Sequence, residues 1–330
     1  MARALPPGKL PAALLAELLG ALPPAPPELR LGPHPGEDAC AIDVPAGTLV
    51  VAADPITLTG HGVGAHAVVI NANDVAVTGT RPRWFLATVL LPEGTREDAV
   101  RALFAEMQVA LDACGTTLVG GHTEVTGAVR QPVVAGQMLG LAEPDRIVRT
   151  GGARTGDVVV QAGPAPVEGA AVLAAEAGER LTGVDLANRK RAERALREPG
   201  ISVVEPALRA AELGATALHD PTEGGLAAGL GELAAASNVK LRIDADNVLW
   251  FDAGLAVCRA LGADPWATLA SGCLLAAFPE ATAQAACEAL ARGGTPARAI
   301  GRAESGAGVF RHDGSEIAAP DRDEVARVLA

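Results

Sequence analysis

The sequence is poor in the residues on which nucleic-acid-binding proteins depend. It has no tyrosine, five phenylalanines, three tryptophans and three lysines among its 330 residues. The net charge is −12 and the isoelectric point is about 5.0. Binding to nucleic acid draws its affinity from basic side chains that neutralise phosphates, and often from aromatic rings that stack on bases. We therefore exclude nucleic acid as a partner.

Cysteine is also scarce, and its spacing argues against two common classes of protein. The five cysteines are scattered and odd in number, and no two of them form a CxxC pair. This pattern argues against a disulfide framework and against a cysteine-rich zinc site.

The apolar run at 10–22 is interrupted by Pro11 and Glu17 and is too short to cross a bilayer. We expect a soluble, cytoplasmic protein with reduced, buried thiols and no membrane segment.

The length and composition predict two globular domains. Hydrophobic residues make up 49% of the chain, which is enough for two cores. Predicted strands and helices alternate in both halves, which indicates an α/β or α+β layered fold. A proline-rich helical or flexible segment at 1–30 precedes a first domain at 31–150. A change to Gly, Thr and Arg near Gly151 marks the start of a second domain at 151–330.

Two local patterns in the first domain also lead to specific predictions. Thr95 followed by Asp98 fits a capping box, which predicts the start of a helix. The segment 116–119 predicts a short strand that ends at Gly120–Gly121. Glycine lets a backbone approach a phosphate closely, so this pair and Gly224–Gly225 are candidate phosphate contacts. Neither a GxxxxGK[ST] loop nor a GxGxxG motif after a predicted strand is present.

Four aspartates at predicted strand ends or turns are the first candidates for chemistry. They are Asp38, Asp54, Asp74 and Asp220. Carboxylate oxygens from separate segments suit Mg²⁺, which keeps water and phosphate oxygens in its other coordination positions. Asn71 lies three residues before Asp74 and shares a face of the predicted helix with it. A single Asp in such a place is also typical of a turn, so the residues alone indicate only a candidate magnesium–phosphate site.

Six motifs occur in an order that resembles the PurM-like superfamily. This superfamily includes aminoimidazole ribonucleotide synthetase, selenophosphate synthetase, thiamine-monophosphate kinase and the hydrogenase-maturation protein HypE. The chain looks most similar to the HypE-like, AIR synthase-related branch, chiefly through its ND-x₄-G-x-x-P and DPTEGGL motifs. The six motifs are GEDACAI (36–42), VVAADPIT (50–57), NANDVAVTGTRPRW (71–84), LVGGHTEVT (118–126), GARTGDVVV (152–160) and HDPTEGGLAAGL (219–230).

The resemblance implies a two-domain PurM-like fold and a Mg²⁺–ATP site. The N-terminal α/β domain would pair with its twin through a shared β-barrel, which makes the protein a homodimer, and the C-terminal domain would be α+β. ATP would bind between the domains. By motif, the metal ligands would be Asp38, Asp54, Asp74 and Asp220, and the catalytic residues Asp74, His122 and Asp220. The nucleotide-binding residues would be Asn71, Asn73, Gly120, Gly121, His122, Thr123 and Glu124.

Three departures from the family patterns argue against assigning the reaction of any one named family member directly to this chain. HypE proteins end in a tail with a terminal cysteine, whereas the last cysteine here is Cys287, inside a predicted helix. Cys40 lies within GEDACAI, whereas selenophosphate synthetases carry their reactive residue in a mobile glycine-rich loop. Thiamine-monophosphate kinases have Asp where this chain has His122. The roles of Lys9, His122 and Glu124 stay open at this stage.

The sequence therefore predicts an enzyme that uses Mg²⁺ and ATP to phosphorylate or activate an oxygen of a small substrate. The oxygen would be of amide, formyl or carboxylate type, or would belong to a phosphate acceptor. One alternative is an ATP-binding sensor or maturation scaffold that performs no phosphoryl transfer. Another is a metal hydrolase that uses the same carboxylates without a nucleotide. The second substrate could be a small molecule or a group carried on a protein.

Overall fold

Two compact units make up the chain, and each is built around its own sheet. The computed structural model describes residues 29–31, 40–44, 47–57, 62–144 and 146–330. The division between the two units falls between Ile147 and Val148. In the described residues, no helix is long and apolar enough to cross a membrane.

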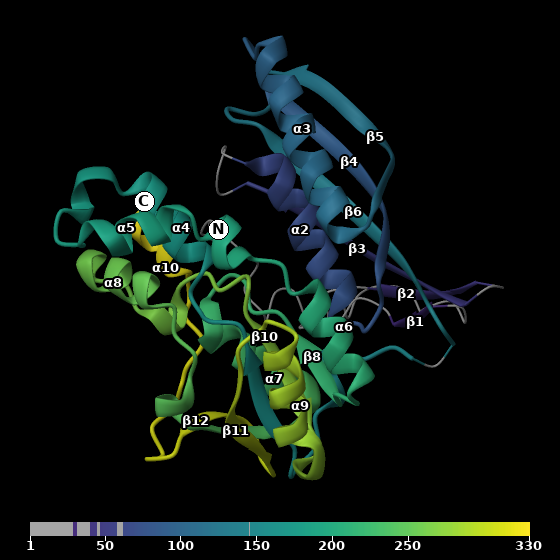
Figure 1. Ribbon diagram of the computed structural model, residues 1–330, viewed down its shortest axis with the longest axis vertical. Helices are drawn as coiled ribbons and strands as arrows, with labels where there is room; N and C mark the ends of the chain where they lie inside the picture. The colour runs from purple at the N-terminus through teal and green to yellow at the C-terminus, as the bar shows by residue number, and fades with distance from the viewer. Residues whose placement is uncertain (1–28, 32–39, 45–46, 58–61, 145) are drawn as a thin grey trace, which may run out of the picture. The chain divides into compact units, whose positions relative to one another are not determined.

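The first unit contains six described strands and two described helices. The bounds are β1 (Leu29–Leu31), β2 (Cys40–Val44), β3 (Gly47–Ile56), α2 (Val63–Ala76), β4 (Pro82–Pro92), α3 (Glu97–Cys114), β5 (Thr117–Thr126) and β6 (Val133–Ala142). The strand order is β1-β2-β3-β6-β4-β5, and the β4–β5 pair is parallel while the other pairs are antiparallel. Helix α2 packs on β3 and β6, α3 packs on α2, and β5 forms one edge of the sheet (Figure 1).

The covered face of this sheet follows the period of two that a half-buried strand requires. In β6, every second residue from Val134 to Ala142 is buried. In β3, Val50 and Ala52 are buried on the same side, and alternation places the Asp54 side chain on that side too. Small residues in α2 let the helix lie close to these strands. The candidate residues of β3 and α2 therefore belong to one helix–sheet interface.

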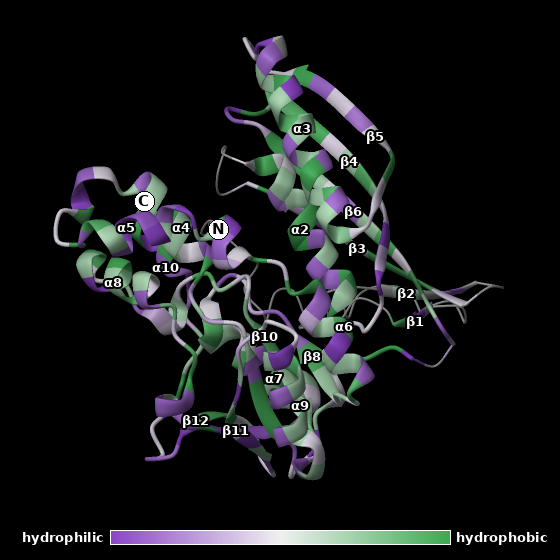
Figure 2. Ribbon diagram, viewed as in Figure 1, coloured by the Kyte–Doolittle hydropathy of each residue, from purple (hydrophilic) through white to green (hydrophobic). Residues whose placement is uncertain are grey.

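Strand β5 differs from its neighbours because every residue except Thr126 is exposed. Hydrophobic residues lie next to hydrophilic ones along it (Figure 2). The prediction that this strand ends at Gly120–Gly121 is wrong, since it runs through both glycines to Thr126. Gly121 makes this pairing possible, because a Cβ there would lie 2.1 Å from the backbone oxygen of Ala87 on β4.

The capping box predicted at the start of α3 is also wrong. The helix begins at Glu97, and its N-cap residue Arg96 makes no side-chain cap hydrogen bond. The Thr95 hydroxyl donates instead to the Pro92 carbonyl at 2.7 Å, and Asp98 pairs with Arg96 at 3.1 Å. Thr95 therefore belongs to a tight turn after β4 and Asp98 to a local ion pair, so neither side chain caps the helix.

The second unit contains another six described strands, flanked by helices. The strand order is β12-β9-β11-β7-β10-β8, and β7 and β10 are buried along their whole length. Helices α7 and α9 pack against strands of this sheet, and α4, α5 and α8 pack on one another. The bounds are β7 (Val158–Ala162), α4 (Glu168–Glu176), α5 (Leu186–Glu193), α6 (Val204–Glu212), β8 (Ala217–His219), α7 (Gly225–Ser237), β9 (Lys240–Ile243), α8 (Asp252–Leu261), β10 (Leu274–Phe278), α9 (Glu280–Arg292), β11 (Ala297–Glu304), β12 (Gly308–Arg311) and α10 (Glu324–Val328).

Candidate nucleotide and metal site

The side chain of Asn71 holds the backbone of Asp54. Asn71 Oδ1 accepts a hydrogen bond from the Asp54 N–H at 2.8 Å, and Asn71 Nδ2 donates to the Asp54 carbonyl at 3.1 Å. The same amide also donates to the Ala67 carbonyl, one turn earlier in α2, at 2.8 Å. Asn71 is fully buried, so no water competes for these bonds. The amide thus makes the pair of bonds that a neighbouring strand residue would make, and it fixes Asp54 relative to α2.

Gly136 provides the space that Asn71 occupies. Asp54 pairs in register with Gly136 of β6. A Cβ on Gly136 would lie 2.5 Å from Asn71 Nδ2 and 2.7 Å from Phe85 Cε2, distances at which atoms must shift. The sequence analysis did not select Gly136, since nothing local distinguishes it from other glycines. It is a positioning residue for Asp54 through Asn71.

Two further candidates, Asn73 and Asp74, also lie in α2. Asn73 is fully buried and Asp74 is 8% exposed. Asp74 lies one turn along the helix from Asn71, as the three-residue spacing predicts. Asp54 and Asp74 therefore project from a strand and a helix that pack together. Asn71 is different, because at least three hydrogen bonds to backbone groups already occupy its amide.

The predicted phosphate-contacting residues 120–124 are in β5 and not in a loop. Asp54, Gly136, Ala87 and Gly121 pair successively across β3, β6, β4 and β5. At about 4.8 Å per strand, Gly121 lies roughly 14 Å from Asp54 along the sheet. The first unit by itself therefore does not bring β5 and Asp54 into contact. As an edge strand with β4 on one side, β5 keeps outward-facing backbone groups for a ligand or another strand.

His122 and Glu124 form a pair on one face of β5. His122 Nε2 lies 3.3 Å from Glu124 Oε2, and the side chains are 64% and 49% exposed. Residues two apart in a strand point to the same side, which explains why they meet. Gly120 and Thr123 are exposed as well. The pair can hold or pass a proton at His122, but at this exposure its own ion pair contributes little to stability.

Asp220 lies in the second unit, between β8 and the N-terminus of α7. Asp220 and the preceding His219 are each 2% exposed, and His219 Nε2 lies 2.8 Å from Glu232 Oε2 of α7. The turn after Asp220 is closed by two bonds to the Thr222 carbonyl, from Gly225 N–H at 3.0 Å and from Ala270 N–H at 3.2 Å. A buried, hydrogen-bonded turn at a helix N-terminus positions Asp220.

Asp323, far along the chain, completes this turn. Its Oδ2 accepts from the Gly224 N–H at 2.7 Å, and its Oδ1 accepts from the Val325 N–H at 2.7 Å, where Asp323 is the N-cap of α10. Burial raises the pKa of Asp323 to about 6, and the carboxylates of Glu223 and Glu168 add to the rise, although the two N–H groups oppose it. One side chain thus caps α10 and binds the turn that carries Asp220.

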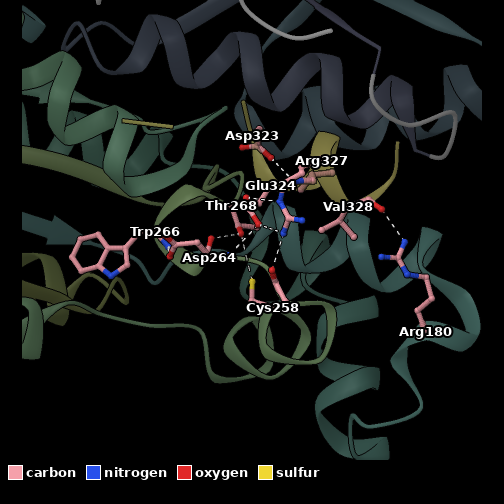
Figure 3. Close-up of polar contacts among 11 residues, drawn as sticks. Arg180, Cys258, Asp264, Trp266, Thr268, Asp323, Glu324, Arg327 and Val328 are labelled. Atoms are coloured by element: carbon pink, nitrogen blue, oxygen red, sulfur yellow. Dashed lines mark hydrogen bonds and ion pairs between the residues drawn. The ribbon is translucent and has the colours of Figure 1, made fainter. Parts of the chain in front are cut away.

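Polar contacts tie down the segment that carries Asp323 (Figure 3). Arg180 donates to the Val328 carbonyl at 2.8 Å, and Arg327 donates to the Gly262 carbonyl at 2.7 Å. Glu324 accepts from Arg327 at 2.8 Å and from the Asp264 N–H at 3.1 Å. Helix α10 was not predicted from the sequence, although Asp323 followed by Glu324 is an N-terminal helix signal.

The described cysteines confirm the prediction of buried, unpaired thiols. Cys114, Cys258, Cys273 and Cys287 are all buried, and none of them forms a disulfide with another described cysteine. Burial raises the pKa of Cys258 to about 11 and that of Cys273 to about 12, and it raises the pKa of Cys287 as well. Because the thiolate is the nucleophile, these last three are not suited to covalent catalysis or to carrying a substrate group.

The donor chemistry of the predicted metal ligands suits Mg²⁺, but neither unit assembles the whole set. Asp54 and Asp74 belong to the first unit, Asp220 belongs to the second, and Asp38 and Lys9 lie outside the described residues. Within the described part of the chain, no three His, Cys, Asp or Glu side chains lie close enough to hold a metal ion. Mg²⁺ is commonly bound by one or two carboxylates together with water and phosphate, so two aspartates from one helix–sheet interface are compatible with it.

Comparison with known proteins places the chain in a family. Models of the two domains of AIR synthase related proteins match residues 36–142 (N-terminal domain) and 154–313 (C-terminal domain). A carbamoyl dehydratase HypE from Rhodobacter capsulatus is 33% identical over 238 residues, which cover 72% of this chain and 67% of that protein. The chain belongs to the AIR synthase-related family. This confirms the superfamily, and the HypE-like branch within it, that the six motifs indicated.

Other relatives and solved structures agree with this assignment. HypE from Rhizobium leguminosarum bv. viciae is 28% identical over 262 residues, covering 77% of this chain and 73% of that protein. The crystal structure of HypE in complex with ATP has a TM-score of 0.73 at 25% identity, covering 88% and 90% of the two chains. AaThiL in complex with AMPPCP and TMP has a TM-score of 0.71 at 20% identity, covering 92% of each, and shows the shared fold. The predicted PurM-like two-domain fold is confirmed.

Proposed function

We propose that this AIR synthase-related protein is a Mg²⁺–ATP-dependent enzyme that phosphorylates, and so activates, an oxygen of a small or protein-borne substrate. The similarity to carbamoyl dehydratases over 72% of the chain carries the proposal. The fold shared with an ATP complex of HypE at 25% identity supports the nucleotide. The sensor or scaffold alternative is not favoured, because the named relatives are enzymes.

In the proposed site, the carboxylates of Asp38, Asp54, Asp74 and Asp220 hold magnesium. Bound Mg²⁺ would neutralise phosphate charge, which is what phosphoryl transfer most requires. Asn71 keeps Asp54 in position through its two backbone hydrogen bonds, and Gly136 leaves room for it. Asp323 keeps the turn after Asp220 in position through the Gly224 N–H. The other proposed nucleotide contacts are Asn73 and residues 120–124, with His122 as a proton carrier.

The relatives indicate the type of oxygen that is activated. A dehydratase removes water from a carbamoyl group, and phosphorylation of the carbamoyl oxygen turns it into a good leaving group. The C–O bond can then break as phosphate departs, and the C–N multiple bond forms as the nitrogen gives up its two protons to a base or to water. We propose an amide-type oxygen of this kind as the acceptor. The four described cysteines are buried, so none of them carries the group.

The decisive test compares Asp74→Asn with the wild-type protein. The assay is Mg²⁺-dependent release of ADP from ATP in the presence of a metabolite extract, with mass spectrometry of the product. We expect Asp74→Asn to lower turnover by at least about a hundredfold, about 2.7 kcal/mol, while the thermal unfolding midpoint stays within a few degrees. Asp112→Asn, at an exposed position of α3, is the matched control and should keep full activity. Full turnover in Asp74→Asn would show that Asp74 does not belong to the site. Absence of any ATP-dependent product from the wild-type protein would refute the proposed enzymatic activity.

We also propose that β5 is the homodimer interface, so that a second copy covers its edge. No other described strand pairs with the outer edge of β5, and the strand carries Leu118, Val119 and Val125, which are 36%, 52% and 57% exposed. Long edge strands that carry apolar residues are usually protected in native proteins. Pairing with another β5 would protect this edge and enclose residues 120–124. A cytoplasmic location fits the free thiols of the described cysteines.

A further inference from the structure

A cavity of about 600 Å³ in the second unit lies apart from the residues assigned above. Its walls come from the end of α5, from the segment before α8 and from prolines that flank β7 and β11. The size falls within the usual range for small-molecule sites. Its charged and aromatic lining residues are Lys190, Arg191, Arg194, Glu198, Trp250, Phe251 and Asp252. None of these belongs to the six motifs of the proposed nucleotide site.

One wall of the cavity is rigidly built. The fully buried side chain of Gln161 accepts from the Leu249 N–H at 2.9 Å and donates to the Leu249 carbonyl at 2.9 Å. Ala165 extends this contact, since its N–H donates to the Leu249 carbonyl at 3.1 Å and its carbonyl accepts from the Phe251 N–H at 2.8 Å. Trp250 packs edge-to-face on Trp266, with ring centroids 5.1 Å apart. Trp250 and Phe251 are therefore held in fixed positions at the cavity.

The same cavity is also lined by a cluster of cations. Lys190 and Arg194 are four residues apart and project from the same side of α5, with Arg191 beside them. In the described part of the chain, none of the three has a carboxylate within ion-pair distance, and Arg191 lies 5.6 Å from the centre of the Phe251 ring. Cations in the last turn of a helix are common because they offset its dipole, so the cluster alone would indicate nothing. Here the cluster lines the same cavity as Trp250 and Phe251.

A second cavity in the same unit is self-neutralised, which means that its arginines are paired with carboxylates of the protein. A space of about 390 Å³ is also lined by arginines, Arg242 and Arg302. Arg242 pairs with Glu304 at 3.0 Å, and Arg302 pairs with Glu280. Those arginines are paired with carboxylates, whereas Lys190, Arg191 and Arg194 have no ion pair among the described residues. Three cations against the two carboxylates that also line the cavity, Glu198 and Asp252, leave a net positive charge there. In a chain with a net charge of −12, this local positive charge attracts an anion.

We propose that the larger cavity binds a small organic anion that carries a planar ring. The ring would lie against Trp250 and Phe251, and the anionic group, a carboxylate or a phosphate ester, would contact Arg191 and Arg194. Arginine suits both groups because its planar guanidinium can donate two parallel hydrogen bonds. Two of the eight aromatic residues in the chain lie at this one cavity, which favours a ring over an aliphatic anion. The proposal does not depend on the proposed Mg²⁺–ATP site.

The test uses phenyl phosphate and benzoate as probes, with inorganic phosphate and benzyl alcohol as the anion-only and ring-only controls. Binding to the full chain is measured by calorimetry and by tryptophan fluorescence. We expect at least one probe to bind at least about tenfold more tightly than both controls. Tighter binding of phenyl phosphate would indicate a phosphate ester as the ligand, and tighter binding of benzoate would indicate a carboxylate. Trp250→Phe should remove most of the fluorescence response while binding persists.

Variants locate the site. Arg191→Gln combined with Arg194→Gln should weaken the preferred probe at least about tenfold, since both charge-assisted contacts to the anion are lost. Arg302→Gln, in the self-neutralised cavity, should change the affinity less than about twofold. The double variant should leave the affinity for Mg²⁺–ATP unchanged. Failure of both probes to exceed the controls, equal effects of the double and control variants, or a parallel loss of Mg²⁺–ATP affinity would overturn the proposal.

Discussion

Gly136 and Gly140 offer a matched pair of perturbations that tests whether Asn71 positions Asp54. Both glycines lie on β6 and on its buried face. An alanine Cβ at Gly136 would lie 2.5 Å from Asn71 Nδ2, and one at Gly140 would lie 2.6 Å from Thr80 Cγ2 and 2.7 Å from the Arg81 carbonyl. The two substitutions create similar steric conflict, but only Gly136→Ala displaces Asn71.

The expected magnitudes follow from the contacts that would be lost. Overpacking of a buried position costs about 1–3 kcal/mol, which we expect for Gly140→Ala. Gly136→Ala should add the loss of up to three hydrogen bonds of Asn71, each worth about 0.5–1.5 kcal/mol. We therefore expect it to lower the free energy of unfolding by about 2.5–7.5 kcal/mol if all three bonds are lost. If Asp54 binds magnesium, its displacement should also weaken Mg²⁺–nucleotide binding at least about tenfold.

The assay pairs urea unfolding with calorimetry of a non-hydrolysable ATP analogue and Mg²⁺, at a temperature where both variants are folded. Gly136→Ala should lose both stability and nucleotide affinity, whereas Gly140→Ala should lose stability and keep its affinity within about twofold. Equal affinity losses in the two variants would show that general damage to the sheet is responsible. Unchanged affinity in Gly136→Ala would refute the positioning role of Asn71.

Two further predictions concern Asp323 and β5. Because the pKa of Asp323 rises from 3.8 to about 6 on folding, the folded state binds its proton more tightly. The free energy of unfolding should therefore fall as pH rises from about 4 to 6, by about 3 kcal/mol from this group. In urea unfolding, Asp323→Asn should reduce this pH dependence of the free energy of unfolding, whereas Asp313→Asn, at an exposed position, should not. A pH dependence in Asp323→Asn equal to that of the wild type would contradict the prediction. Val119→Glu with Val125→Glu should convert the dimer to a monomer in analytical ultracentrifugation, since a buried unpaired carboxylate costs several kcal/mol. Val109→Glu, at a 70% exposed position of α3, should not, and a persistent dimer in the β5 variant would place the interface elsewhere.

Much of the fold could be predicted because local patterns and tertiary demands agree. The apolar segment Leu274–Phe278 predicts a strand and the segment 280–292 predicts a helix, and the structure has β10 and α9 with these bounds. Both are flanked by clear signals, namely Pro279 before the helix and Gly293 after it. The wrong prediction for β5 comes from a place where a long-range contact decides. β5 continues through two glycines because β4 lies beside it, and no local pattern of LVGGHTEVT reports that neighbour.

The candidate site separates in the same way into residues that carry chemistry and residues that position them. Asp54, Asp74 and Asp220 were predicted because carboxylates at strand ends, turns and helix faces have a recognisable chemistry. Asn71 was also predicted, as a residue that holds either the loop or the nucleotide, and its amide is bonded to the backbone of Asp54.

Gly136 and Asp323 were not predicted at all, because each acts on a segment distant in sequence. Asp323 bonds to a turn 99 residues earlier in the chain, and Gly136 acts by having no side chain. A carboxylate can therefore be recognised from its own motif, but the groups that hold it in place are recognisable only from the folded contacts. Substitutions at Gly136 and Asp323 thus test the site more specifically than further substitutions within the motifs. They displace Asp54 and Asp220, respectively, and leave both of these carboxylates in the chain.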